Sequence, residues 1–385
     1  MPKLIRITTV PSSMRSLLKG QLRFMTNYFE VVAISSDSED FDEIMHLQGD
    51  IRGYRVEMTR KITIVKDLKA LFGIIKILRR ERPDIVHTHT PKAGLLGMLA
   101  AWICRVPHRL HTIAGMPLLE AHGLKRVVLN FVELLTNACA TNVYPNSFVM
   151  MDIMRQNRLA SPRKMKVLGN GSSNGIDVEY FSPEAVGRTK EEIRRDLGIY
   201  DNMFTFVFVG RIVRDKGMNE LVEAIKLLDK EGKKFKVIIV GRFESELDPL
   251  REGNEEFIRT HSSVCYVGLQ SDVRPYLLAA DALVFPSYRE GFPNVVMQAG
   301  AMGLPCIVTD INGCNEIVED GVNGVIIPPK DVQALHNAMT AMCEDADFRA
   351  RMALVAREKI TSRYKQQDMW DALLTEYNEQ LGIRN

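Results

Sequence analysis

Short apolar runs alternate with longer amphipathic segments along the first half of the chain. Several of the runs are β-branched and apolar on both faces, which is typical of buried parallel strands. They predict strands at residues 3–10, 29–35, 84–88, 108–113, 140–145 and 164–169. Helical periodicity fills the intervals, at about 15–28, 65–82, 92–104, 123–138 and 148–159. This alternation predicts a parallel sheet with helices on both of its faces.

The same alternation begins again near residue 204. It predicts strands at 204–210, 235–241, 263–267, 281–286, 305–309 and 324–327. Helices are predicted between and after them, at 217–231, 271–279, 294–302, 331–343 and 366–381. The segment 169–201 is rich in Gly, Ser, Asn and Pro before a short charged helix, which suits a hinge.

The chain is therefore predicted to be an α/β protein with two doubly wound, Rossmann-like domains, residues 1–170 and 171–365. The length of 385 residues agrees with two cores rather than one. The last helix, within 366–385, is expected to pack back on the first domain. Two such domains joined by a hinge are expected to face a central cleft at the carboxyl ends of both sheets, where open α/β sheets bind ligands.

Composition narrows the class of protein. A formal net charge of +2 gives no general argument for binding nucleic acid. The six cysteines include no Cys-x-x-Cys pair, which favours reduced thiols in a cytoplasmic protein over disulfides or a zinc site. No apolar signal segment begins the chain, and the longest apolar run, 94–104, is far shorter than the roughly 20 residues that span a bilayer.

The first chemically informative cluster follows the strand at 204–210. Gly210 permits a tight turn, Arg211 offers a planar fork of donors, and Lys216 adds a point charge near the start of the next helix. Together these groups suit a diphosphate, although the same residues also fit an ordinary charged loop. The cluster matches neither a GxGxxG fingerprint nor a P-loop, which disfavours NAD and P-loop ATP chemistry.

A second cluster follows the strand at 281–286. Glu290 precedes a Gly-Phe-Pro turn that opens a helix, and Gln298 lies two helical turns inside it. A carboxylate there can accept hydrogen bonds from sugar hydroxyls, and the backbone N–H groups of a helix start can face an anion. The alternative is a helix-start charge and an ordinary interior amide.

These clusters and several other motifs, in this order along the chain, resemble glycosyltransferase family 4. The matching segments are Pro83-Asp84-Ile85-Val86-His87-Thr88-His89, Asn174-Gly175-Ile176-Asp177, Gly210-Arg211 with Lys216-Gly217, Glu290-Gly291-Phe292-Pro293 and Glu319-Asp320-Gly321-Val322-Asn323-Gly324. The resemblance implies the GT-B fold and sugar transfer with retention of the anomeric configuration. Among its branches, the chain most resembles bacterial enzymes of capsular and lipid-linked oligosaccharide assembly.

The resemblance also implies roles for individual residues. Arg211 and Lys216, after Gly210, would hold the donor diphosphate, and Glu290 would bind the transferred sugar. The turn Phe292-Pro293-Asn294-Val295 would contact sugar or phosphate through backbone amides. Gln298 stands where the family has a second glutamate that binds the ribose, and an amide can still serve a ribose diol.

In the first half, His89, Thr112, Ser12 and Ser13 are expected to contact substrate. The serines replace a glycine-rich loop of the family, and Ala114 stands where family members commonly carry a histidine. His111 lies three residues earlier, so on a strand it should point to the opposite face. His87 and His89 share a strand face, but without a nearby carboxylate or cysteine we expect no metal site.

The expected activity is transfer of a hexose or N-acetylhexosamine from a nucleotide-diphosphate sugar, by family habit a UDP-sugar, to a saccharide acceptor that a polyprenyl diphosphate carries. No cofactor or metal is expected, because the nucleotide sugar is a co-substrate, and no nucleic-acid partner is expected. Two alternatives stay open: a nucleotide-sugar 2-epimerase of the same fold, and a non-catalytic homologue suggested by Ala114 and Gln298.

Two amphipathic basic segments, 65–80 and 123–132, would suit peripheral contact with anionic lipid at the inner face of the cytoplasmic membrane. They fit ordinary domain helices with solvated lysines as well. Sequence pattern leaves both interpretations open.

Overall fold

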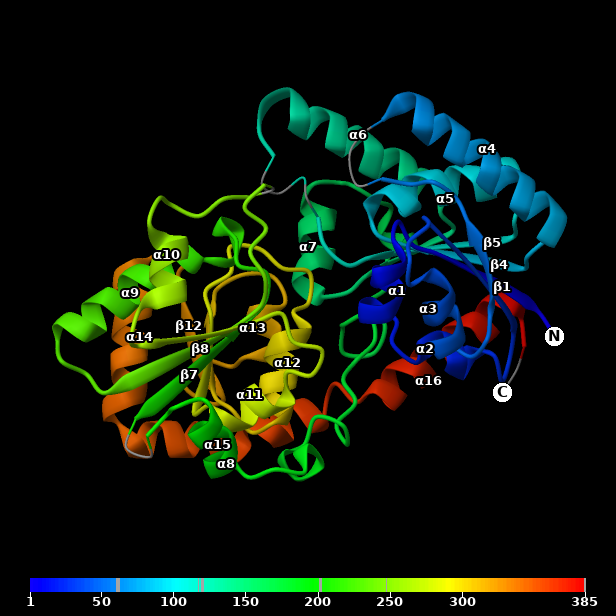
Figure 1. Cartoon of the computed structure of the whole chain (residues 1–385). Coiled ribbons are helices and arrows are strands. Elements are labelled where there is room, and N and C mark those ends of the chain that lie inside the picture. The colour runs from blue at the N-terminus through cyan, green and yellow to red at the C-terminus, as the bar shows by residue number, and fades with distance from the viewer. Residues whose placement is uncertain (60–62, 117, 119–120, 201–202, 247, 384–385) are drawn as a thin grey trace. The chain divides into compact units, whose positions relative to one another are not determined.

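The computed structural model describes residues 1–59, 63–116, 118, 121–200, 203–246 and 248–383, and Figure 1 traces the chain. The chain divides into two compact units, Met1–Gly175 with Gln366–Asn385, and Ile176–Lys365. The division after Gly175 lies close to the expected boundary at residue 170, and the C-terminal helix belongs to the first unit.

The first unit contains a parallel sheet of six strands in the order β3-β2-β1-β4-β5-β6. The strands are β1 Lys3–Ile7, β2 Glu30–Ser35, β3 Arg52–Arg55, β4 Ile85–His89, β5 His108–Ile113 and β6 Asn142–Pro145. The chain winds outward from β1 to β3 and then returns to β4 on the other side of β1. This is the doubly wound arrangement that the alternating pattern predicted.

Helices cover both faces of this sheet because successive strand residues point to opposite sides. Ile5 and Ile7 share one core with α4 and α5, whereas Leu4 shares another with α1, α2, α3 and α16. The helices of the unit are α1 Pro11–Leu17, α2 Gln21–Met25, α3 Phe41–Leu47, α4 Ile64–Glu81, α5 Pro91–Ile103, α6 Gly123–Cys139, α7 Phe148–Gln156 and α16 Gln366–Leu381.

The second unit repeats the plan, with strand order β12-β11-β10-β7-β8-β9. Its strands are β7 Phe204–Val209, β8 Phe235–Val240, β9 Val264–Gly268, β10 Ala282–Phe285, β11 Cys306–Thr309 and β12 Gly324–Ile327. Its helices are α8 Lys190–Asp196, α9 Met218–Lys230, α10 Asn254–Thr260, α11 Arg274–Ala279, α12 Asn294–Ala301, α13 Cys314–Ile317, α14 Val332–Glu344 and α15 Ala346–Thr361. The ends of β7 and β10 carry the two clusters singled out in the sequence.

Some predicted elements were wrong. Residues 164–169 form no strand, and only an isolated bridge joins Met165 to Val143. Edge strand β3 was missed because Arg52-Gly53-Tyr54-Arg55 contains no apolar run. The helix predicted over 15–28 is two helices: α1 ends at Leu17, and Gly20, with a φ of +77°, is the N-cap of α2. Helices α3, α10, α13 and α15 were not predicted.

None of the helices in the described part of the chain is both long enough and apolar enough to cross a membrane. All six cysteines are free thiols, as their spacing predicted.

Candidate functional site

The turn after β7 lies against the end of β10. It contains the 3₁₀ turn η4 (Arg214–Lys216) and then Gly217, whose φ is +69°. A Cβ atom on Gly217 would lie 2.0 Å from the carbonyl oxygen of Pro286, so only glycine allows this approach. The N–H of Tyr288 donates to the carbonyl oxygen of Asp215 at 2.9 Å and joins the two loops. Lys216 is thereby held beside the loop that carries Glu290.

Lys216 and Glu290 form an ion pair, in which Nζ of the lysine donates to Oε1 of the glutamate. Their side chains are only 14% and 16% exposed. The hydroxyl of Ser287 donates to the same Oε1 at 2.9 Å. Two residues predicted separately, one for phosphate and one for sugar, are therefore direct neighbours.

The backbone around Glu290 is fixed from behind by the loop after β11. Nδ2 of Asn312 donates to the carbonyl oxygens of Glu290 and Gly291, at 3.1 and 2.5 Å. Gly313 packs so closely that an added Cβ would lie 2.5 Å from the oxygen of Gly291. The contacts from Asn312 and Gly313 therefore hold the backbone that carries the Glu290 carboxylate.

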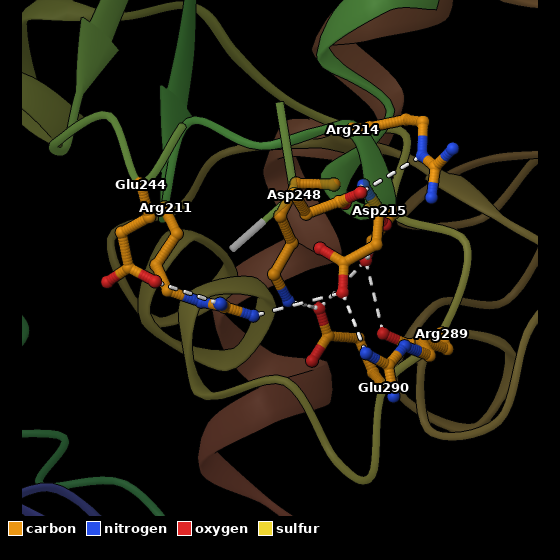
Figure 2. A network of polar contacts seen from close by, with 9 residues as sticks. Arg211, Arg214, Asp215, Glu244, Asp248, Arg289 and Glu290 are labelled. Atoms are coloured by element: carbon orange, nitrogen blue, oxygen red, sulfur yellow. Dashed lines mark hydrogen bonds and ion pairs between the residues drawn. The ribbon is translucent and has the colours of Figure 1, made fainter. Parts of the chain in front are cut away.

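Arg211 reaches two carboxylates (Figure 2). Its guanidinium lies 3.1 Å from Glu244 and 3.9 Å from Asp215. Burial acts to raise the pKa of Glu244, but the hydrogen bonds and charges of Arg211 and Arg242 outweigh burial and lower the pKa below its usual value. Glu244 is therefore ionised at neutral pH and holds Arg211 in place.

The network continues through Asp215 and Asp248. Arg289 lies 3.0 Å from Asp215, and Arg214 lies 3.0 Å from Asp248 (Figure 2). With Lys216, Glu290 and the Arg242 that also bonds Glu244, five cations and four carboxylates lie around the ends of β7, β8 and β10. The cations are not free, so an incoming diphosphate competes with carboxylates for Arg211 and Lys216.

Helix α12 begins at the same place and offers unused donors. Within the described part of the chain, no acceptor is bonded to the backbone N–H groups of Phe292, Asn294 or Val295. Pro293 is the N-cap residue and lacks an N–H, so it shapes the turn and donates nothing. These N–H groups, with the positive end of the helix, can receive phosphate or sugar oxygens.

Gly210 and Gln298 complete the predicted set in this unit. The N–H of Gly210 donates to Val240 at 2.9 Å, and a Cβ on Gly241 would lie 1.8 Å from the oxygen of Gly210. Gln298 lies half-buried on α12, and none of the described residues bonds its amide. The amide is therefore open to a ligand.

In the first unit, His89 and Thr112 belong to a buried polar network. Nε2 of His89 lies 2.7 Å from the guanidinium of Arg6, and Thr112 lies 2.7 Å from Nε2 of His87. Burial, then the charge of Arg6, lowers the pKa of His87 and His89 well below the usual value, so both rings are neutral. The two rings stack with centroids 4.5 Å apart, as their shared strand face predicted.

The cavity beside this network is small. His89 and Thr112 line it, and its volume is about 10 Å³, which is the space for about one water molecule. Nδ1 of His89 is buried there without a partner among the described residues. In this structure both side chains organise the end of the sheet, and their contact with a substrate stays a prediction.

Ser12 and Ser13 open α1 directly after β1. Ser12 is exposed and Ser13 half-buried, so both can be reached by a ligand. His111 bonds Thr88 at 2.8 Å, on the sheet face opposite to His87 and His89. The predicted offset between His111 and Ala114 is not tested, because β5 ends at Ile113, before Ala114. Across the described residues, no cluster of three potential metal ligands occurs.

Four residues of the site were missed in the sequence. Asp215, Glu244, Ser287 and Asn312 fix Arg211 and Glu290 in place. Asp215 directly precedes Lys216 and Ser287 lies three residues before Glu290, so their position in the sequence was a usable signal. Glu244 and Asn312 come from other loops, and their involvement depends on the order of strands in the sheet.

Comparisons with known proteins identify the family. The family described as "Glycosyl transferases group 1" matches residues 189–359, and that described as "Glycosyl transferase 4-like domain" matches residues 28–171. The capsular polysaccharide biosynthesis glycosyltransferase CapM of Staphylococcus aureus is 32% identical over 98% of this chain and 97% of its own length.

A second relative is the UDP-Gal:alpha-D-GlcNAc-diphosphoundecaprenol alpha-1,3-galactosyltransferase of Escherichia coli. It is 31% identical over 82% of this chain and 81% of its own length. Among solved structures, Anabaena Alr3699/HepE in complex with UDP-glucose superposes with a TM-score of 0.82 at 19% identity, over 98% of this chain and 100% of that one.

Proposed function

This chain is a glycosyltransferase of family 4 with the GT-B fold, and we propose that it transfers a hexose or N-acetylhexosamine from a UDP-sugar to a saccharide linked to polyprenyl diphosphate. The transfer retains the anomeric configuration, as is usual in the family. The first unit binds the acceptor and the second binds the donor.

The observation that carries the proposal is the Lys216–Glu290 pair beside Arg211. A UDP-sugar presents a diphosphate next to a neutral ring with hydroxyl groups. Guanidinium and ammonium groups suit the diphosphate, and a carboxylate accepts hydrogen bonds from the hydroxyls. The free N–H groups of α12 add donors on the same side.

The same groups explain how transfer is accelerated. Negative charge grows on the departing UDP while the sugar acquires oxocarbenium character. Lys216, Arg211 and the start of α12 form a preorganised positive field for that charge. Glu290 orients the sugar and lies close enough to the ammonium to keep the site balanced in charge before the donor binds.

Retention without an enzyme nucleophile requires attack from the face that the diphosphate leaves. In this mechanism the acceptor hydroxyl attacks within an ion pair, and a phosphate oxygen of the leaving UDP takes its proton. The carboxylate of Glu290 is ion-paired and hydrogen-bonded to Ser287, which suits binding rather than nucleophilic attack. No metal or other cofactor enters this scheme.

The choice of acceptor and location follows the relatives. The Escherichia coli relative is named for a UDP-Gal donor and a diphosphoundecaprenol-linked acceptor. A lipid-linked acceptor places the reaction at a membrane surface, and nucleotide sugars are made in the cytoplasm. We therefore place this enzyme at the inner face of the cytoplasmic membrane, in the synthesis of a bacterial surface polysaccharide.

The test is a thermal-shift panel of UDP-, GDP- and dTDP-sugars with purified protein, followed by transfer of the best binder to polyprenyl-diphosphate-linked saccharides. We expect a UDP-sugar to raise the unfolding temperature and the product to carry the new sugar with the donor's anomeric configuration. Formation of an epimer from donor alone, or donor binding without transfer to any such acceptor, would contradict the proposal.

A further inference from the structure

Helix α6 is oriented against its own amphipathic pattern. Its apolar stripe faces outward, with exposed fractions from 42% to 79% for Leu124, Val127, Val128, Phe131 and Leu134. Its buried positions instead include the polar residues Glu133, Thr136 and Asn137. A soluble domain helix normally shows the reverse arrangement.

The buried polar residues of α6 confirm that this orientation is built into the unit. Thr136 donates to the carbonyl oxygen of Val132 at 2.8 Å, and Asn137 donates to that of Leu159 at 3.1 Å. Burial raises the pKa of Glu133 to about 7, so the carboxyl group is partly protonated near neutral pH. Rotating α6 to hide its apolar stripe would expose these groups and break the bond from Asn137 to Leu159, whereas the bond from Thr136 to Val132 lies within the helix.

Helix α4 adds a second exposed apolar stripe. In its first half, Ile64, Val65, Leu68 and Phe72 have exposed fractions from 50% to 74%. Helix α5 packs against both α4 and α6, and Figure 1 shows the three helices on one side of the sheet. We call the nine exposed residues of α4 and α6 the α4–α6 apolar face.

The exposed charges on helices α4 and α6 themselves are cationic, and one of these cations, Lys66, is paired with the exposed Glu57 that precedes α4. The exposed or half-exposed cations of the two helices include Lys69, Lys76, Arg79, Arg80, Lys125 and Arg126. The acids of the same helices are engaged or buried. Asp67 bonds Lys92, Glu81 is buried with Lys3, and Glu133 is buried. An apolar stripe with basic neighbours is typical of helices that lie in an anionic lipid interface.

We propose that the α4–α6 apolar face docks on the surface of an anionic lipid bilayer. The apolar side chains enter the boundary between headgroups and acyl chains, and the lysines and arginines contact lipid phosphates. Exposed apolar faces with a polar rim also occur at protein–protein interfaces, but here the exposed charges of the two helices are cations, which complement anionic lipid headgroups. This inference rests on the proposed function in one respect: a lipid-linked acceptor would give the enzyme a reason to bind a membrane surface.

The test is co-sedimentation of the full chain with vesicles of phosphatidylcholine alone or with 30% phosphatidylglycerol. We expect binding to the anionic vesicles, weakened at high salt. V127Q/F131Q should weaken it about ten-fold or more, and K69Q/K125Q about five-fold for each charge removed. The matched control is L269Q/L354Q, which removes two apolar side chains of the second unit that are at least as exposed.

Several outcomes would overturn the docking proposal: no binding by the wild-type chain, equal loss in the control, or a dimer that V127Q/F131Q dissociates in light scattering. The donor thermal shift, measured without lipid, separates this proposal from the proposed function. We expect V127Q/F131Q to show the same rise in unfolding temperature with the donor as the wild-type chain. If the donor does not raise the unfolding temperature of the wild-type chain, that result contradicts the proposed function and leaves the docking proposal standing.

Discussion

Nζ of Lys216 donates a hydrogen bond to Oε1 of Glu290, a residue 74 positions further along the chain. The ammonium group is the one expected at the donor diphosphate, and the carboxylate is the one expected at the transferred sugar. Their contact places two binding functions as close together as phosphate and sugar are in the donor. It also keeps both charges paired while the site is empty.

We expect the two members of this pair to act on different parts of the donor. K216Q removes positive charge at the leaving group, so kcat should fall on the order of 100-fold and UDP binding should weaken. E290Q should lower kcat for the UDP-sugar but should not weaken UDP binding, because it removes a carboxylate that competes with the diphosphate for Lys216. Calorimetry with UDP and initial rates with the UDP-sugar measure these effects. K226Q breaks an exposed pair on α9 and should change neither; near-normal turnover by E290Q would refute the role of Glu290.

Restoring an acid at Gln298 should strengthen donor binding. Q298E replaces a neutral acceptor by a charged one at the expected ribose position, and charge-assisted hydrogen bonds are roughly twice as strong. We expect UDP affinity to rise about ten-fold, measured by calorimetry. The control is Q333E on α14, and the interpretation fails if the two variants bind UDP alike.

Gly217 should be far less tolerant of substitution than a glycine of the same backbone conformation. Gly217 and Gly232 have φ of +69° and +70°, but only Gly217 would place a Cβ against the oxygen of Pro286. G232A should lower the free energy of unfolding by about 1–2 kcal/mol, because alanine is disfavoured in the left-handed region. G217A should lower the free energy of unfolding by about 1–3 kcal/mol more than G232A does, because its Cβ would overpack against Pro286. Calorimetric unfolding compares the variants, and equal costs would mean that the approach to Pro286 is not tight.

Glu133 should make stability depend on pH. Its pKa is about 7 in the folded chain and 4.5 as the ordinary value, so between these pH values the folded state keeps a proton that the unfolded state releases. Stability therefore falls as pH rises from 4.5 to 7, by about 3 kcal/mol in total. E133Q keeps an uncharged side chain, so we expect it to raise the unfolding temperature at pH 8 and to have little effect near pH 4.5. An equal gain at both pH values would show that the charge of Glu133 is not responsible.

Most strands could be predicted because buried parallel strands are continuous apolar runs. The run at 324–327 coincides with β12, and the run at 204–210 extends β7 by one residue. The exceptions have a physical reason. Strand β3 lies at an edge, where Arg52 and Arg55 can stay in solvent, and the apolar residues at 164–169 are buried by packing without joining the sheet as a strand.

The sequence by itself determined the two wound units, the glycines that allow tight turns, and the residue types of a diphosphate and sugar site. These depend on local periodicity and side-chain chemistry. Only the tertiary structure decided that Lys216 meets Glu290, that carboxylates already hold Arg211, and that α6 presents its apolar stripe to the outside. Strand order brings distant loops together and packing selects which side of a helix is covered, and neither is encoded in the spacing of residues along the chain.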